Sequence, residues 1–395
     1  MLNIKACIIL MYFIINILSF YIVSYSMNYG NTLNYISVYH TADLTTPLFV
    51  VILSYVLVYI VVSSGINDNK LSKINNNRVR YFSIDIFYLF VLSYNMAVFF
   101  STGIGRAGGS VEGVGFLQSI LPIYQITFIY YAAIRLSQRK WSFLLLFIGC
   151  LFILIKGWSS HIMILIIAEV IYILYFKRIS IYRVFLAIIL GGISLIVFFY
   201  IYKLKYFFRL GAVIDVDFFF FLEYALSRLS AFSNFSYLYD IGDGMNMTLS
   251  LYGKGHYFVV TEMLSSLIPK SWLGMDNYRA LDNIFGISYV NSSLDTSGFS
   301  ITLPGILLIA YNFSIVSFLI SIVTLLVVIK TISCVMVRMH GLPGYAIAFS
   351  LICYINYSGS IKELALFLYA IILFSFCCLL LRFILVRLVT TSSFS

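Results

Sequence analysis

Residues 44–64 read LTTPLFVVILSYVLVYIVVSS and contain no charged side chain. A helix needs about 20 mostly apolar residues to cross a membrane, because the hydrocarbon core is about 30 Å thick and each residue adds about 1.5 Å. This stretch is therefore long enough to cross. The whole chain has the same character, since 62% of its 395 residues are apolar, 10% are charged and the mean hydropathy is +1.00. Such a composition excludes a soluble enzyme, a disordered chain, a disulfide scaffold and a collagen.

The same length criterion predicts an all-α, polytopic integral membrane protein with about ten transmembrane helices and one large external loop. The candidate spans cover residues 4–26, 44–64, 81–101, 117–135, 142–156, 161–176, 184–202, 303–329, 344–361 and 364–386. Residues 1–202 then form an N-terminal membrane bundle of seven spans, and residues 203–302 form the external loop with re-entrant or surface helices. Residues 303–395 add three C-terminal membrane helices.

The Lys and Arg residues are unevenly divided between the two faces that these spans define. The formal net charge is +10, from 25 basic and 15 acidic residues. If all ten spans cross, one face receives fifteen basic residues, whereas the short loops of the other face hold Arg106, Lys156 and Lys362 alone. Because cytoplasmic loops collect Lys and Arg, we expect both termini in the cytoplasm and the large loop outside. The excess of positive charge then reports topology and gives no reason to expect a nucleic-acid partner.

The external loop is the most polar part of the chain, and its first half combines cations with apolar residues. Arg209 ends a basic stretch after the seventh predicted span, which is either a cationic step at the membrane surface or a set of lipid anchors. Residues 218–240 have apolar side chains at helical spacing, which predicts an amphipathic helix lying on or dipping into the bilayer. Arg228 interrupts this helix. Its planar guanidinium suits phosphate oxygens, unless it pairs with Glu223 or anchors a lipid phosphate.

The second half of the loop contains a further predicted helix, which ends before Pro269. His256 lies at the start of this helix and beside Lys254, where the helix N-terminus can attract an anion. A purely structural role for His256 has equal weight. Glu262 follows six residues later, so one helix points these two side chains in different directions. Trp272 offers an aromatic face on which a carbohydrate can stack.

Three further features carry weaker signals. Arg279 is most simply a surface residue paired with a neighbouring Asp. Arg106 is the only basic residue of a glycine-rich external loop, whose backbone N–H groups can form an anion-binding concavity. Asp215 and Asp217 form a D-x-D pair, a spacing that holds a divalent metal in many glycosyltransferases, but solvated carboxylates are the favoured interpretation. The Cys and His residues lack metal-ligand spacing, so we expect no metal and no cofactor.

The layout and several motifs together resemble the bacterial O-antigen polymerase family, whose members are integral membrane glycosyltransferases. The residues that carry the resemblance are Gly255-His256, Glu262, Ile268-Pro269-Lys270-Ser271-Trp272, Ser297-Gly298-Phe299-Ser300, Leu303-Pro304-Gly305 and Tyr311-Asn312-Phe313-Ser314. In such polymerases an Ile-Pro-(Arg/Lys)-x-x-Trp-like stretch recurs, as does an Asn-Phe-Gly-like start of the following span. Here the Trp comes one residue sooner, Ser314 stands in place of Gly, and the paired Arg-x10-Gly motifs of some members are absent.

The resemblance implies a GT-C-like glycosyltransferase architecture and a role in lipopolysaccharide biosynthesis at the periplasmic face of the bacterial inner membrane. The implied reaction is an inverting transfer of a growing glycan from an undecaprenyl-diphosphate carrier onto the next lipid-linked repeat unit, without nucleotide sugar or metal. The implied partners are the undecaprenyl-diphosphate-linked oligosaccharide, membrane lipid, a chain-length-determining co-polymerase and a flippase.

The polar residues of the external side can be placed in this reaction. Those expected to bind the diphosphate or the glycan are Arg209, Arg279, Arg106, Lys254 and Trp272. Arg228 would act with these arginines to neutralise the departing diphosphate, which stabilises developing charge. His256 or Glu262 would take the proton from the attacking hydroxyl, and we expect at most one of them to serve as the base.

Two other functions fit the same layout. A flippase of the same pathway would transport lipid-linked oligosaccharide without catalysis. Such transporters usually have short loops and cations that line a central cavity, so the long external loop counts against a flippase. A membrane O-acyltransferase needs a catalytic His near the bilayer, and His256 would suffice. Chemical analysis of the glycan separates this case, because acylation and chain length are distinct outcomes.

Overall fold

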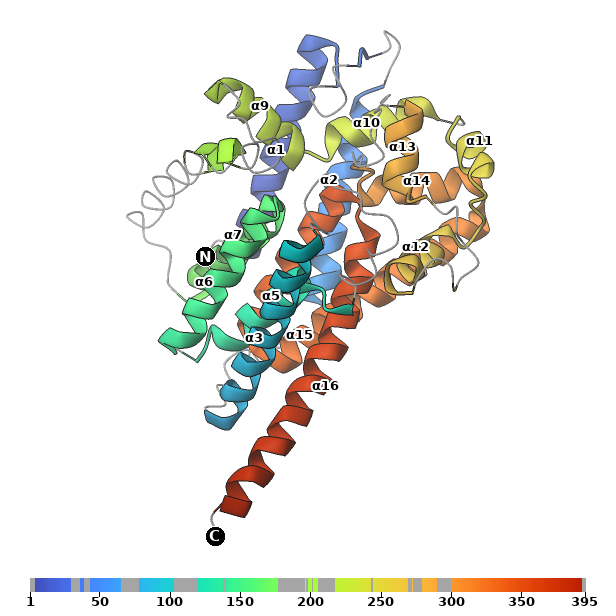
Figure 1. Ribbon diagram of the computed structural model, residues 1–395. Helices are drawn as coiled ribbons and strands as arrows, with labels where there is room; N and C mark the ends of the chain where they lie inside the picture. Colours follow the sequence, from blue (N-terminus) through green and yellow to red (C-terminus); the bar gives the residue numbers. More distant parts are fainter. Residues whose placement is uncertain are drawn as a thin grey trace. The chain divides into compact units, whose positions relative to one another are not determined.

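The computed structural model of the chain (Figure 1) is mainly helical in the residues that it describes. These residues are 4–29, 36–38, 43–64, 78–102, 120–137, 139–176, 196, 198–200, 202–204, 217–242, 244–268, 272, 279–289 and 300–392. Within them no strand forms, and the β pairing is limited to an isolated bridge between Asn28 and Ser37. The prediction of an all-α protein is confirmed for this part of the chain.

The helices follow the predicted apolar runs closely in the first third of the chain. Their bounds are α1 Ile4–Ser26, α2 Thr45–Ser63, α3 Arg78–Thr102, α5 Ile123–Ile134, α6 Lys140–Ile155, α7 Ser159–Phe176, α9 Phe218–Leu229, α10 Phe232–Ile241, α11 Gly244–Leu251, α12 Phe258–Leu267, α13 Leu281–Tyr289, α14 Leu303–Phe313, α15 Ile315–Ser358 and α16 Ile361–Ser392. Among these, α1, α2, α3, α15 and α16 are long and apolar enough to cross a membrane. The protein is therefore membrane-embedded in character. The count of ten spans stays a prediction, and the seventh, 184–202, falls mostly outside the described residues.

The predicted eighth span, 303–329, is wrong as a single helix. The structure divides it at Ser314, whose backbone is extended (φ −175°, ψ 156°) between α14 and α15. Ser314 accepts a hydrogen bond on Oγ from the backbone N–H of Ser317 at 3.0 Å. A serine in this position caps the first turn of the helix that follows, so it favours a new start over continuation of the old helix. The apolar pattern alone did not reveal this break.

α15 consists of two helices joined at Gly341, whose backbone is non-helical (φ 61°, ψ −134°). A Cβ placed on Gly344 would lie 2.1 Å from the carbonyl oxygen of Met336. Residues eight apart in one straight helix are separated by about 12 Å, so the chain must turn back on itself here. Residues 315–340 and 342–358 are thus consecutive helices with a one-residue turn, where the sequence predicted spans at 303–329 and 344–361.

The chain forms two compact units, each assembled from separate segments. Unit 1 comprises Met1–Ser64, Asp215–Lys330 and Leu351–Ala365. Unit 2 comprises Gly65–Ile214, Thr331–Ser350 and Leu366–Ser395. Most of the predicted external loop belongs to unit 1, together with the first two helices. The predicted division into residues 1–202, 203–302 and 303–395 describes membrane topology and stays a prediction.

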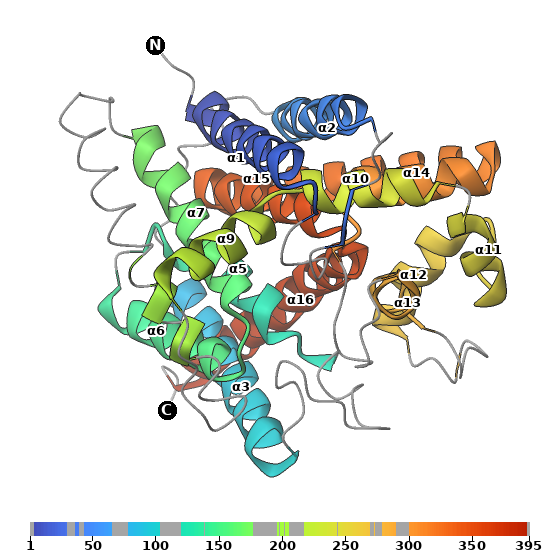
Figure 2. The same cartoon turned by 90° about the horizontal axis from the view of Figure 1, so that it is seen from above.

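The core of unit 1 is built around α10. The helices α1 and α2 run side by side (Figure 2), and α10 packs against both of them and against α14. Every residue from Phe232 to Leu238 is buried. Asn16 of α1 accepts the backbone N–H of Phe232 at 2.9 Å, and Ser19 of α1 lies 2.9 Å from Ser233 between their hydroxyl oxygens. The segment 218–240, predicted as one amphipathic helix, is instead broken after Leu229, and its second half lies in the core.

The loop helices of unit 1 lie at the end where α1 finishes. The ring of Tyr29, just after α1, packs on Tyr237 of α10 with centroids 5.4 Å apart. The turn between α15 and α16 is at this end as well, because Gly359 touches the backbone of Thr302, directly before α14. We refer to this as the loop end of unit 1.

Lys330 marks the other end of unit 1. It lies sixteen residues beyond Ser314 in α15, which corresponds to about 24 Å of helix. Its ammonium donates to the hydroxyl of Ser64 at 2.7 Å and to the carbonyl oxygen of Val61 at 3.1 Å, at the end of α2. Lys330 and the end of α2 therefore lie together, at the end of unit 1 opposite the loop end. Which end faces the cytoplasm stays a prediction.

The two described carboxylates of unit 2 both pair with arginines. Asp85 of α3 accepts the hydroxyl of Tyr130 at 2.8 Å and lies 3.5 Å from the guanidinium of Arg139. Glu169 of α7 forms a two-pronged ion pair with Arg135, at 2.6 and 2.7 Å. These contacts join α3, α5, α6 and α7, so both acidic groups have a structural role in this part of the molecule.

Replacing Gly359 by alanine is expected to destabilise unit 1 by about 2–4 kcal/mol. Gly359 has φ +69°, and a Cβ there would lie 2.5 Å from the backbone nitrogen of Thr302, which cannot move aside as a side chain can. The control is Gly253→Ala, because Gly253 has φ +65° but open space around it; it should cost about 1 kcal/mol. Thermal unfolding of the purified variants measures both effects, and equal losses would contradict the predicted close contact.

Candidate functional site

A buried ion pair joins Lys254 and Glu262 at the loop end of unit 1. Glu262 lies on the buried face of α12, one turn after Phe258, and Lys254 follows the end of α11. The ammonium of Lys254 is 3.4 Å from Oε2 of Glu262 and donates to the carbonyl oxygen of Arg279 at 2.7 Å. Their side chains are 2% and 3% exposed. Two charges this deeply buried require each other, since either one alone would lose its hydration without compensation.

Lys362 supplies a second cation to the same carboxylate. Its ammonium lies 3.2 Å from Oε1 of Glu262 and 3.8 Å from Oδ1 of Asp282. The backbone N–H of Leu281 also donates to Oε1 of Glu262, at 3.3 Å. The set Lys254, Glu262, Asp282 and Lys362, here called the lysine–carboxylate cluster, thus connects α12, α13 and the start of α16. In the sequence, Lys362 only contributes to the division of basic residues between the two faces. Nothing in its local pattern pointed to Glu262.

His256 is exposed and lies at the junction of α14 and α15. Its Nδ1 is 2.8 Å from the hydroxyl oxygen of Ser314, and its ring packs edge-on against Phe313 with centroids 5.0 Å apart. It follows Lys254 of the lysine–carboxylate cluster by two positions in the chain. The ring is therefore held in place on one side and open to solvent on the other, which suits a group that exchanges protons.

The placement of His256 and Glu262 distinguishes between the two expected bases. They contact different partners, as their spacing along the chain predicted. Both oxygens of Glu262 already accept hydrogen bonds or ion pairs, whereas His256 has a single described polar partner at Nδ1. In this geometry Glu262 holds α12, α13 and the start of α16 together, whereas His256 is exposed.

Hydroxyl groups fasten three further loop helices to one another. Tyr237 of α10 donates to the carbonyl oxygen of Tyr289 in α13 at 2.9 Å. The hydroxyl of Tyr289 in turn donates to the carbonyl oxygen of Gly244 and lies 2.6 Å from the hydroxyl of Thr248 in α11. These contacts hold the short helices α10, α11 and α13 in fixed positions relative to one another.

Asp240, near the end of α10, was not singled out by its sequence. Its Oδ2 is buried and accepts no hydrogen bond from the described residues. Burial raises the pKa of this carboxyl from 3.8 to about 6. A half-buried carboxyl that titrates near neutral pH is a candidate participant in acid–base chemistry. The nearby Gly242 has φ +55° and ends α10.

Stability should depend on pH through Asp240. Because its folded-state pKa lies above the ordinary value, the folded protein binds this proton more tightly and loses stability as pH rises from about 4 to about 6. Asp240→Asn should remove this loss and raise stability at pH 7 by about 1 kcal/mol, a figure reduced for the solvent contact of the side chain. Melting temperatures of both proteins between pH 4 and pH 8 measure the effect.

Asp43 provides a control in which the effect of ionisation on stability has the opposite sign. Hydrogen bonds from the side chains of Thr46 and Thr45 and from the backbone N–H of Thr45 lower its pKa to about 2. Its ionised form therefore favours the folded state, and this contribution is lost as pH falls from about 4 through 2. Asp43→Asn should lower stability at pH 7. A neutral or destabilising effect of Asp240→Asn, with Asp43→Asn behaving as expected, would contradict the assignment of Asp240.

The remaining predicted residues are not brought into the cluster by the described structure. Arg106 and Arg209 lie outside the described residues, and Arg228 is described only for its backbone, within α9. Arg279 contributes its carbonyl oxygen to Lys254, and its own side chain is exposed. Trp272 is 79% exposed.

The D-x-D pair is accounted for in part by helix capping. Asp217 accepts the backbone N–H of Phe218 at 2.7 Å and caps α9, while Asp215 lies outside the described residues. Across the described part of the chain no three His, Cys, Asp or Glu side chains gather in a way that could hold a metal ion.

Comparison of the chain with models of known protein families, with curated proteins and with solved structures gave no match. The resemblance to O-antigen polymerases therefore depends on the motifs of this sequence alone.

Proposed function

We propose that the protein polymerises undecaprenyl-diphosphate-linked repeat units of O-antigen, or of a related polysaccharide, by inverting glycosyl transfer. The site would be the loop end of unit 1, at the external face of the bacterial inner membrane. The observation that carries the proposal is the position of His256, an exposed imidazole held by Ser314 and adjoining the lysine–carboxylate cluster.

Two segments of the resemblance support this proposal by meeting in space. Gly255-His256 precedes α12, and Asn312-Phe313-Ser314 lies where α14 ends and α15 begins, more than fifty residues later. His256 contacts both Phe313 and Ser314. Glu262 is another motif residue, and it lies between these two segments in the sequence. It anchors α12 to Lys362 at the start of the last membrane helix. The motifs thus have a shared physical role at one end of a helical membrane unit, compatible with a GT-C-like enzyme.

In the proposed reaction, a hydroxyl of the acceptor sugar attacks the anomeric carbon of the donor glycan. The new glycosidic C–O bond forms as the C–O bond to the diphosphate breaks, and undecaprenyl diphosphate leaves with the bonding electrons. When Nδ1–H of His256 donates to Ser314, Nε2 keeps its lone pair and takes the hydroxyl proton. The negative charge of the leaving group needs cations, for which Arg228 and Arg209 are the candidates.

A deletion strain of the source bacterium tests the proposed function. Its lipopolysaccharide should carry a single repeat unit in place of a ladder on a silver-stained gel, and the intact gene should restore the ladder. An unchanged ladder in the deletion strain would refute the proposal. Loss of export, with polymerisation intact in a purified system, would favour the flippase instead, and an unchanged chain length with altered acylation would favour the acyltransferase.

A further inference from the structure

The turn between α6 and α7 in unit 2 buries a lysine that has no carboxylate partner among the described residues. Lys156 is 1% exposed, and its ammonium lies 4.9 Å from the ring centre of Tyr124 and 5.5 Å from that of Phe152. Each described ion pair of the chain involves other cations. Ring faces attract a cation, but they replace only part of its lost hydration. A charge this buried at a membrane helix end is a functional-site candidate.

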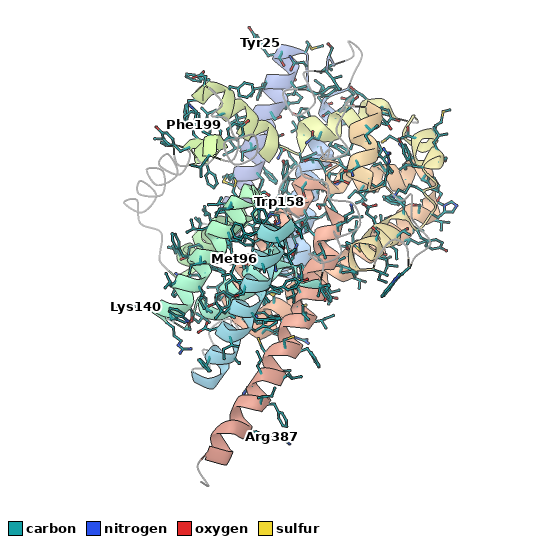
Figure 3. All side chains as sticks on the ribbon, in the orientation of Figure 1. Tyr25, Met96, Lys140, Trp158, Phe199 and Arg387 are labelled. Atoms are coloured by element: carbon teal, nitrogen blue, oxygen red, sulfur yellow. The ribbon has the colours of Figure 1, made fainter. Side chains whose placement is uncertain are left out.

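A histidine and further aromatic rings complete the surroundings of Lys156. The ring of His161 lies 4.4 Å from Tyr124, so the ammonium and the imidazole flank the same tyrosine. Two further rings contact His161: Phe128, stacked at 5.8 Å, and Trp158, edge-on at 5.7 Å. Trp158, labelled in Figure 3, is 37% exposed, so this side chain reaches the surface.

The start of α7 adds a second positive element beside the ammonium of Lys156. The helix begins at Ser159, three residues after Lys156, and the positive φ of Gly157 (86°) makes the tight turn between them. The first backbone N–H groups of a helix lack acceptors within it and carry partial positive charge. They therefore favour an anion, above all a phosphate group. The buried ammonium, the imidazole and the helix start together are called the Lys156 site.

We propose that the Lys156 site binds a phosphate group at the membrane surface. The turn connects two apolar helices, so it lies at the depth of the head groups, where phosphate is the prevalent anion. The phosphate can belong to a membrane lipid or to a phosphorylated compound in solution, and the recognition chemistry is the same for both. The Lys156 site uses none of the residues of the candidate site in unit 1 and does not depend on the proposed polymerase activity.

Fluorescence of Trp158 tests this directly. The chain has three Trp residues, so Trp141→Phe with Trp272→Phe leaves Trp158 as the single reporter in full-length protein purified in dodecyl maltoside, a detergent without phosphate. Sodium pyrophosphate and dihexanoyl-phosphatidylglycerol are titrated separately. We expect a saturable change in emission, with affinity at least about tenfold lower in Lys156→Met and largely kept in Lys156→Arg. Methionine retains the apolar stem, so its packing on Tyr124 and Phe152 is preserved.

Lys203→Met is the matched control, because the ammonium of Lys203 lies 4.6 Å from the ring of Phe199 without burial of this kind. It should bind both probes as well as the parent protein does. Saturation by both probes indicates recognition of phosphate from either source, and saturation by phosphatidylglycerol alone indicates a lipid head group. No saturable change with either probe, or equal affinity in the parent protein and a folded Lys156→Met, would overturn the proposal.

Discussion

Replacing His256 by alanine is expected to slow polymerisation by about 10²–10⁴-fold, the usual contribution of a positioned general base. Because His256 is exposed, its removal should change the melting temperature by no more than about 2 °C. The measurement is the initial rate of chain growth by purified protein supplied with lipid-linked repeat units. His256→Gln should be as slow as His256→Ala, since an amide can contact Ser314 but cannot take the proton.

Tyr257→Phe serves as the control for His256, because Tyr257 is the neighbouring residue and is also exposed. It should retain the rate of the unaltered protein. A His256→Ala rate within twofold of that rate would show that another group takes the proton. Asp240, with its pKa of about 6, would then be the next candidate to test.

Replacing Glu262 by alanine is expected to lower the free energy of unfolding by about 3–5 kcal/mol, because it leaves the buried ammonium of Lys254 without its carboxylate. Lys362 loses its nearer partner in the same variant. Asp282→Ala is the matched control: Asp282 also pairs with Lys362, but its side chain is 47% exposed, so about 1 kcal/mol or less should be lost. Thermal unfolding in detergent compares the two variants.

A double variant separates the charge from the packing at this cluster. Lys254→Met combined with Glu262→Leu removes both buried charges and should recover much of the stability lost in Glu262→Ala, since apolar residues of similar volume often replace buried ion pairs without loss. Equal stability of Glu262→Ala and Asp282→Ala would mean that the cluster is not buried as described.

Much of the fold in the first third of the chain can be predicted from sequence, because the signal is local. The span 44–64 is uniformly apolar, and α2 covers Thr45–Ser63. The span 303–329 is equally apolar, yet it breaks at Ser314 because one hydroxyl caps a new helix. Hydropathy averages over many residues and therefore cannot register a single cap. Hydropathy cannot reveal the reversal at Gly341 for the same reason.

The burial of α10 could not be predicted because its environment is set by distant parts of the chain. Its serines and asparagine look solvent-facing in a helical pattern. In the fold Ser233 shares a hydrogen bond with Ser19 of α1, and Asn16 of α1 accepts the backbone N–H of Phe232. These partners are more than two hundred residues away in sequence.

In the candidate site, too, local features could be predicted from sequence and long-range contacts could not. His256 could be found from sequence because it is the one histidine of a polar loop beside a lysine. The pairing of Glu262 with Lys362 spans a hundred residues, and no spacing rule connects them. Asp240 titrates near neutral pH because of burial, which is a property of the packed structure and not of its local sequence.

The most direct test of the proposed function uses purified protein, undecaprenyl-diphosphate-linked repeat units and no other enzyme. The proposal predicts glycans of two or more repeat units, one undecaprenyl diphosphate released for each linkage formed, and inverted anomeric configuration at the new bond. Protein that is folded and bound to the lipid-linked unit, yet yields single repeats with no diphosphate released, would contradict it.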